Sequence, residues 1–221
     1  MIITIDGPAA AGKGTLAATL AQKYRLAYFD TGMVYRAVGL EMRLSGKEIK
    51  DEAAAAAFAR SLTFPRMMEL SRDPRFRDDV GGQYASIVAA MPEVRAALLQ
   101  MQQDFALRPV FADGTPAAGA IYDGRDTGTV VCPGADIKFY VTASPEVRAS
   151  RRHKEFVAKG MNISYEQVLA DVRARDERDS NRSTAPLKPA ADAVILDTSG
   201  LTIAAVLETA EKIIDSYQKN S

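Results

Sequence analysis

The residues with the clearest chemistry lie near the start of the chain, where residues 7–13 read G-P-A-A-A-G-K and match the pattern G-x-x-x-x-G-K. A β-branched apolar run, residues 1–5, precedes the glycines, and an apolar pattern of helical spacing follows them. In a strand–loop–helix context, backbone N–H groups and a helix N-terminus surround an anion, and the lysine adds a positive charge. We therefore predict a nucleoside triphosphate site at Gly7, Pro8, Ala9, Ala10, Ala11, Gly12, Lys13, Gly14 and Thr15.

One position departs from the usual form of this loop. The residue after the lysine is normally Ser or Thr, whose hydroxyl holds Mg²⁺, but here it is Gly14, and Thr15 follows. The form Gly-Lys-Gly-Thr is typical of nucleoside monophosphate kinases. The loop by itself predicts a bound triphosphate and leaves the reaction open.

Three further segments combine arginines with carboxylates: residues 30–36, 123–128 and 175–182. In the last, Arg175, Asp179 and Arg182 are spaced to share one helix face. Alone, such a face fits a solvated helix with ordinary ion pairs, and the Asp-Gly-Arg-Asp segment fits a turn. Beside a phosphate-binding loop, the arginines instead indicate phosphoryl transfer, because moving a phosphoryl group between two anions requires several fixed cations.

The expected elements place these segments at one edge of a sheet. Short apolar runs at 1–5, 27–30, 120–123, 137–142 and 193–197 alternate with helical patterns, which indicates an α/β fold with a five-stranded parallel sheet covered by helices on both faces. Ligands bind such sheets at the carboxyl ends of the strands. We expect residues 63–83 to be an irregular excursion and residues 108–119 to be a loop or small hairpin, all within a single domain spanning 1–221.

Composition narrows the function classes. Lys plus Arg and Asp plus Glu are both 28, so the formal net charge is zero. The chain therefore has no excess positive charge that would attract nucleic acid or an anionic membrane. One cysteine and one histidine argue against internal disulfides and His/Cys zinc sites. No apolar run is long enough to span a bilayer, and the N-terminus lacks the features of a signal peptide. We expect a cytoplasmic monomer.

Four motifs together resemble bacterial cytidylate kinases, which are P-loop nucleoside monophosphate kinases. They are the loop above, Asp-Thr-Gly-x-x-Tyr-Arg, Asp-Gly-Arg-Asp-x-Gly-Thr-Val-Val, and Arg-Asp-x-Arg-Asp-x-Asn-Arg followed by Ala-Pro-Leu-x-Pro-Ala-Ala-Asp. They stand in the family's order and cover most of the chain. The resemblance implies a P-loop three-layer sandwich with a nucleotide-binding excursion at about 45–105 and a helical lid at about 151–184. It also implies transfer from ATP to CMP or dCMP with Mg²⁺.

The resemblance also implies roles for individual side chains. Thr31, Arg36 and Arg125 would hold the CMP phosphate, and Ser86, Arg95 and Asp126 would bind cytosine. The ribose would contact Arg175 and Asp179, Arg182 would contact the phosphates being transferred, and Arg151 would reach the donor from the lid. The implied catalytic residues are Lys13, Arg36, Arg125 and Arg182, with Mg²⁺ held mainly by nucleotide phosphates and water rather than by side chains.

Cytosine itself fits this assignment, because its amino donor and ring acceptors suit a carboxylate beside a cationic donor. Two stretches depart from the family pattern. The excursion between Leu62 and Ser86 is shorter than in the best-known members, which fold a three-stranded piece there. The stretch 108–119 is longer, and either extends the edge of the CMP site or forms a surface loop.

Other functions stay open at this point. A related kinase could phosphorylate UMP, AMP or shikimate. A nucleotide switch or motor is a second class, since Asp123 could serve as the metal-binding acid of an ATPase, although no Asn-Lys-x-Asp motif is present. A binding module without turnover is a third.

Overall fold

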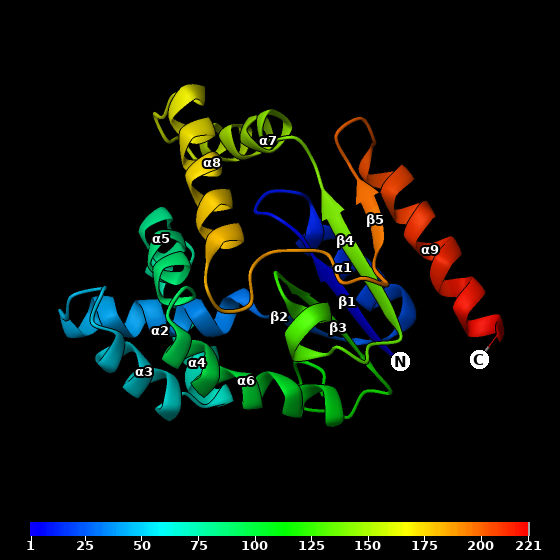
Figure 1. Ribbon diagram of the computed structural model, residues 1–221, viewed down its shortest axis with the longest axis horizontal. Coiled ribbons are helices and arrows are strands. Elements are labelled where there is room, and N and C mark those ends of the chain that lie inside the picture. Colours follow the sequence, from blue (N-terminus) through cyan, green and yellow to red (C-terminus); the bar gives the residue numbers. More distant parts are fainter. Residues whose placement is uncertain (221) are drawn as a thin grey trace.

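A computed structural model describes residues 1–220 and shows a five-stranded sheet with helices on both faces (Figure 1). All four strand pairings are parallel, in the order β2-β3-β1-β4-β5. The strands are β1 (Ile2–Asp6), β2 (Ala27–Asp30), β3 (Ala120–Gly124), β4 (Ile137–Thr142) and β5 (Val194–Asp197). The predicted fold class and all five strands are confirmed, and no strand end is shifted by more than one residue.

Nine α-helices occur within residues 1–220. They are α1 (Lys13–Tyr24), α2 (Gly32–Ser45), α3 (Glu52–Ser61), α4 (Phe64–Leu70), α5 (Asp79–Val88), α6 (Pro92–Leu107), α7 (Pro145–Ala158), α8 (Tyr165–Asn181) and α9 (Ile203–Asn220). Several begin at a side-chain cap: the side chains of Asp51, Ser144 and Ser164 each accept a hydrogen bond from the first turn of the helix that follows.

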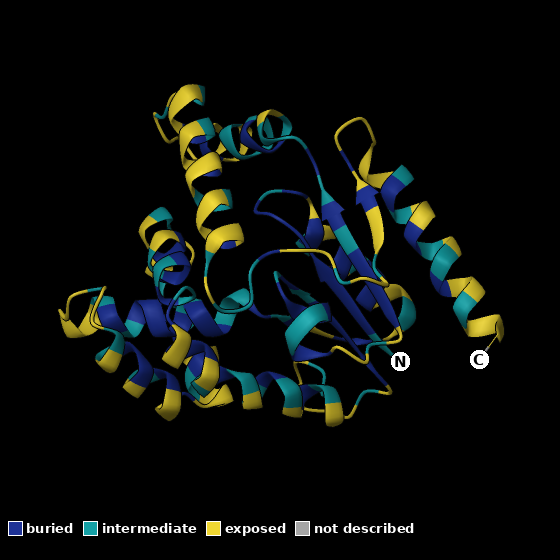
Figure 2. Cartoon of the chain, viewed as in Figure 1, coloured by how far each residue is buried: buried dark blue, intermediate teal, exposed yellow. Residues whose placement is uncertain are grey.

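Two apolar clusters hold the sheet between its helices. On one face, Ile3 and Ile5 of β1 pack with Leu20 of α1 and Ile214 of α9. On the other face, Tyr122 of β3 belongs to the cluster that joins β2 to helices α2–α6. Figure 2 shows the central strands buried, the edge strand β5 largely exposed and the outer faces of the helices exposed. The sheet is therefore a fixed platform for whatever follows its carboxyl ends.

Residues 63–83 are not irregular, which corrects our expectation. They form α4, a 3₁₀ turn (Pro74–Phe76) and the first half of α5. Each begins at a side-chain cap: Thr63 accepts from Arg66, Asp73 from Arg75 and Asp78 from Gly81. These elements are too short for a clear apolar period, and the prolines that suggested a break lie in first turns, where proline is tolerated.

The described part of the excursion contains helices and no strand, so the three-stranded piece of the best-known relatives is absent between residues 45 and 105. The stretch 108–119 forms a small turn closed by one antiparallel bridge between Val110 and Pro116. None of its residues lines the large pocket described below. Of our two interpretations of this stretch, the structure supports the surface loop.

Candidate functional site

A pocket of about 550 Å³ lies at the carboxyl ends of the strands. Its walls come from the segments that follow β1, β2, β3 and β5, and from α5, α6, α7 and α8. In Figure 1 the α7–α8 hairpin stands over this edge of the sheet, with α5 beside α8. The pocket is therefore where the expected ligand edge and the arginine clusters meet.

The glycine loop forms one wall. Gly7 has φ 149°, and a Cβ there would lie 1.9 Å from the carbonyl oxygen of Val141, so only glycine fits beside β4. Gly12, with φ 96°, begins α1. Of the predicted loop residues, Gly7 and Pro8 lie behind the wall, and the rest line the pocket: Ala9, Ala10, Ala11, Gly12, Lys13, Gly14 and Thr15.

Lys13 is buried at the base of the pocket. Its ammonium group donates to the carbonyl oxygen of Pro8 at 2.9 Å and lies 3.8 Å from a carboxylate oxygen of Asp123. Burial lowers the pKa of Lys13, and the positive charge of Arg125 lowers it further, while Asp123 opposes both. Burial raises the pKa of Asp123, against the effect of Lys13. Lys13 and Asp123 are therefore held in position by contacts within the protein.

The opposite wall carries the predicted acceptor residues. Thr31 donates from its hydroxyl to the carbonyl oxygen of Asp123 at 2.8 Å, and Arg36 donates to the carbonyl oxygen of Phe76 at 2.9 Å. Both line the pocket from the turn and helix that follow β2. Each therefore comes to the site from a strand end, as the sequence predicts.

Arg125 and Asp179 meet across the pocket. The guanidinium Nε of Arg125 donates to Asp179 of α8 at 3.0 Å, so Asp179 is paired across the fold rather than along its own helix. Burial lowers the pKa of Arg125, but Asp179 and Asp123 outweigh burial and the net shift is upward. The face of α8 that carries Asp179 is therefore not a solvated one with ion pairs only along the helix.

Arg95 and Asp126 form a second, buried pair joined by a hydrogen bond. The guanidinium of Arg95 also lies over the ring of Tyr35, 5.4 Å from its centroid. Arg182 completes the group, with Nη2 3.7 Å from Asp126, which is within ion-pair range but too long for a hydrogen bond. Arg95, Asp126 and Arg182 thus form one network on three elements.

Three buried polar atoms in this wall have no hydrogen-bond partner within residues 1–220: Ser86 Oγ, Arg175 Nε and Arg182 Nη2. Burial lowers the pKa of Arg175, and Arg125 lowers it further; burial also lowers the pKa of Arg182. Buried polar groups are normally hydrogen-bonded, so unpartnered ones that line a pocket indicate what a ligand must supply. Here the ligand must bring hydrogen-bond acceptors and negative charge.

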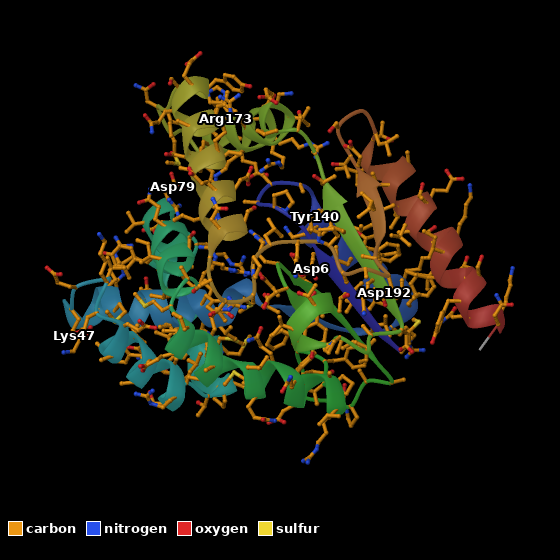
Figure 3. All side chains as sticks on the ribbon, viewed as in Figure 1. Asp6, Lys47, Asp79, Tyr140, Arg173 and Asp192 are labelled. Atoms are coloured by element: carbon orange, nitrogen blue, oxygen red, sulfur yellow. The ribbon has the colours of Figure 1, made fainter. Side chains whose placement is uncertain are left out.

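The turn after β3 depends on a residue that the sequence analysis missed. Asp6, near the centre of the molecule (Figure 3), accepts from the backbone N–H groups of Thr127 and Gly128 at 2.8 and 2.7 Å and from the Thr127 hydroxyl at 2.8 Å. Residues 127–131 form a π-helical turn, which was also not predicted. Asp6 stands at the carboxyl end of β1, and that position was the available signal.

Other pocket residues were given no role in a kinase site. Asp30 and Asp123 end neighbouring strands, and Arg77 and Arg152 add cations. Past Thr198 the pocket ends in an apolar group after β5: Leu201, Ile203, Val206 and Leu207. The predicted donor residue Arg151 lies next to this end, where it donates to the hydroxyl and carbonyl oxygens of Thr198 at 2.9 and 2.7 Å. The apolar group could have been predicted as part of the pocket because it follows the end of β5.

Comparison with known proteins identifies the family. The cytidylate kinase family model matches residues 3–218. A cytidylate kinase of Xanthobacter autotrophicus is 51% identical over 217 residues, covering 98% of both chains. One of Rhodospirillum rubrum is 51% identical over 214 residues, covering 97% of both.

A solved shikimate kinase of Bacteroides thetaiotaomicron is 12% identical with a TM-score of 0.50, and covers 97% of this chain and 98% of its own. An uncharacterised protein of Eubacterium ventriosum reaches a TM-score of 0.52 at 12% identity, and covers 98% of this chain and 99% of its own. These two show a shared fold only. The chain belongs to the cytidylate kinase family.

Proposed function

We propose that this cytidylate kinase divides its pocket in two: the loop between β1 and α1 holds ATP, and the arginine-lined wall holds CMP or dCMP. The γ-phosphoryl group then passes to the acceptor phosphate, giving ADP and CDP or dCDP. The observation that carries this division is a single pocket with a phosphate-binding loop on one side and, on the other, three buried polar atoms that have no hydrogen-bond partner within residues 1–220.

On the donor side, Lys13 and the loop N–H groups bind the ATP phosphates. Arg151 approaches them from α7. The apolar group at Leu201 and Ile203 offers a surface for the adenine ring, since it lies in the same pocket past Thr198. Donor binding thus uses main chain for the phosphates and apolar side chains for the base.

On the acceptor side, Thr31, Arg36 and Arg125 hold the CMP phosphate. The carboxylate of Asp126 accepts from the cytosine amino group, while Ser86 and Arg95 bond the ring acceptors. The ribose contacts Arg175 and Asp179. Because these groups are buried and few, a base of the wrong pattern leaves them unpaired, which discriminates strongly.

The chemistry asks little covalent work of the protein. The acceptor phosphate oxygen is already a nucleophile, so no general base is required, and catalysis rests on alignment and charge neutralisation. Lys13, Arg36, Arg125 and Arg182 are the cations placed around the path of transfer. In this scheme Arg182, at the end of α8, neutralises the phosphoryl group between donor and acceptor.

Mg²⁺ fits this site through its donor set. Carboxylate oxygens, which Mg²⁺ prefers, are present in Asp30 and Asp123 beside Lys13, and a side chain at Gly14 would crowd Asp123, its Cβ lying 3.3 Å away. Among residues 1–220 no cluster of three acidic, His or Cys side chains could hold a metal alone. When bound, Mg²⁺ would neutralise charge on the donor phosphates, and Asp123 and Asp30 are the residues that would hold it from the protein side.

We further propose that residues 45–105 form the acceptor-binding excursion and residues 151–184 the lid. The ion pair between Arg152 of α7 and Asp79 of α5, 3.0 Å apart, joins the two across the pocket. Asp79 is labelled in Figure 3 at the end of α5 next to α8. Such a contact supports a closed arrangement that excludes water during transfer.

A cytoplasmic monomer without nucleic-acid or membrane partners completes the proposal. Charge balance supports it. Separately, none of the helices in residues 1–220 has the length and apolar character needed to cross a bilayer.

The test is ADP release from ATP with CMP, dCMP, UMP, AMP, GMP or shikimate as acceptor. We expect rapid release with CMP and dCMP, and slow release with the other acceptors or with none. Slow ADP release that no acceptor accelerates would instead support a nucleotide switch. Equal rates with UMP or AMP would contradict the assignment of Asp126 and Arg95 to cytosine.

A further inference from the structure

Arg148 is a buried arginine outside the pocket that joins three separate parts of the fold. It lies in the first turn of α7 and is 3% exposed. Its Nε donates to the carbonyl oxygen of Ala143, the residue after β4, at 2.9 Å. Its two terminal nitrogens hold Asp176 of α8 at 2.9 and 2.5 Å, and one of them also donates to the carbonyl oxygen of Ala9 at 3.3 Å.

The contact with Ala9 fixes a peptide unit of the phosphate-binding loop. In a trans peptide the C=O and the following N–H point in opposite directions. Arg148 therefore holds the Ala9 carbonyl away from the anion site and aims the N–H of Ala10 the other way. Ala10 lines the pocket and has φ 60°, a conformation that a non-glycine residue rarely adopts and that needs support from its surroundings.

The contact with Asp176 fixes α8. Two residues of α8, Arg175 and Asp179, line the acceptor wall. Asp176 directly follows the first and lies one turn before the second. A bidentate guanidinium–carboxylate pair sets both the distance and the rotation of the groups it joins. Arg148 thus fixes the position of Arg175 and Asp179 relative to the loop that holds the donor.

The pair is not required to hold α7 against α8. The two helices share their own apolar cluster, in which Ala149 and Phe156 of α7 pack with Val168 and Val172 of α8. Packing supplies the association of the hairpin, so the buried pair is available to define its orientation.

We propose that Arg148 and Asp176 are positioning residues that keep the phosphate-binding loop and the arginine-bearing face of α8 in register for in-line transfer. This inference rests on the proposed division of the pocket into donor and acceptor sides. It assigns to Arg148 and Asp176 no contact with either nucleotide.

The test compares Asp176→Asn and Arg148→Lys with the wild-type enzyme in kcat, in KM for ATP and CMP, and in Tm. Asp176→Asn keeps the shape of the side chain and removes its negative charge. Arg148→Lys keeps the positive charge and removes the two-pronged guanidinium that makes the bidentate contact. Misalignment of reactants by about 1 Å costs on the order of 10² in rate. We expect kcat to fall about 10- to 100-fold in each variant while both KM values change by less than about threefold, and the double variant to be no slower than the slower single one.

An exposed ion pair between the same two helices provides a matched control. Arg173 of α8, labelled in Figure 3, pairs with Glu146 of α7 at 2.8 Å, but both side chains are more than half exposed, 61% and 51%. Arg173→Gln should leave kcat, KM and Tm unchanged, because exposed pairs contribute little.

Two results would overturn the inference. One is unchanged kcat in both Asp176→Asn and Arg148→Lys; the other is a lower Tm with unchanged kcat below it, which would make the pair purely structural. If Asp176→Asn does not fold, Arg148→Lys decides alone. A wild-type enzyme that ignores CMP would instead refute the proposed function, so the two failures are distinguishable.

Discussion

The two sides of the pocket are built in opposite ways. The phosphate-binding part of the donor side is one continuous segment, residues 7–15, whose binding groups are mostly backbone N–H groups at a helix N-terminus. The acceptor side gathers side chains from five separate places: the turn and helix after β2, α5, α6, the turn after β3, and α8. One side depends on the path of the main chain, and the other depends on the identity of individual side chains.

This difference decides how each side tolerates change. A site built from backbone N–H groups loses function when a substitution prevents the main chain from adopting its conformation. A side-chain site keeps its fold and loses a contact when one residue is replaced, because its members come from elements held by their own packing. The predictions below test that contrast.

The largest effect is expected at Gly7. In Gly7→Ala the new Cβ would overlap the Val141 carbonyl oxygen, 1.9 Å away, at φ 149°. Such overpacking against main chain should cost about 3 kcal/mol or more in the free energy of unfolding. Gly12→Ala is the control, since φ 96° strains it but no atom lies within 4 Å, and about 1–2 kcal/mol is expected. Chemical denaturation measures both; equal losses would refute the close approach at Gly7.

The next effect is expected at Arg182. Arg182→Ala should keep the fold and lower kcat by roughly 10³-fold, by analogy with an arginine that neutralises phosphoryl charge. Steady-state ADP release measures the loss, and circular dichroism checks the fold. Arg178→Ala, an exposed neighbour on α8, is the matched control and should remain fully active. A near-normal kcat for Arg182→Ala would refute its catalytic role.

The smallest effect is expected at Ser86. Its buried hydroxyl has no partner within residues 1–220, so Ser86→Ala should not lower Tm. If the hydroxyl bonds cytosine, its removal should raise KM for CMP by roughly 2- to 10-fold, the value of one neutral hydrogen bond. KM for ATP and kcat should stay unchanged. A matching rise in KM for ATP would place Ser86 outside the acceptor side.

The contrast also explains what the sequence could predict. The donor loop was found residue by residue, because its pattern is contiguous and each glycine has a geometric reason. The strands were found because buried parallel strands are short apolar runs. The segments that follow them were correctly placed at the pocket, since parallel strands end at one edge.

The acceptor side was predictable only through family resemblance. No spacing rule joins Ser86 to Arg95 or Arg95 to Asp126, because their proximity depends on how α5 and α6 pack against the turn after β3. Arg148 and Asp176 were missed for the same reason: their pairing crosses 28 residues of sequence. Nothing local distinguishes a buried ion pair from a solvated one.

The prediction that part of the excursion is irregular was wrong for a different reason. Residues 63–83 contain two prolines and two adjacent glycines, which suggested irregular structure. Their helices are too short to show a period, and they are stabilised by burying residues such as Met67, Leu70 and Phe76. Tertiary packing outweighed local propensity there.

The division of the pocket is tested most directly by titrating ATP and CMP separately, by calorimetry, into Lys13→Met and Asp126→Asn. Each loses one charge that the division assigns to a single nucleotide. We expect Lys13→Met to weaken ATP by about tenfold or more and leave CMP unchanged, and Asp126→Asn to do the reverse. If each variant weakens both nucleotides equally, the pocket has no separate donor and acceptor sides and the account is wrong.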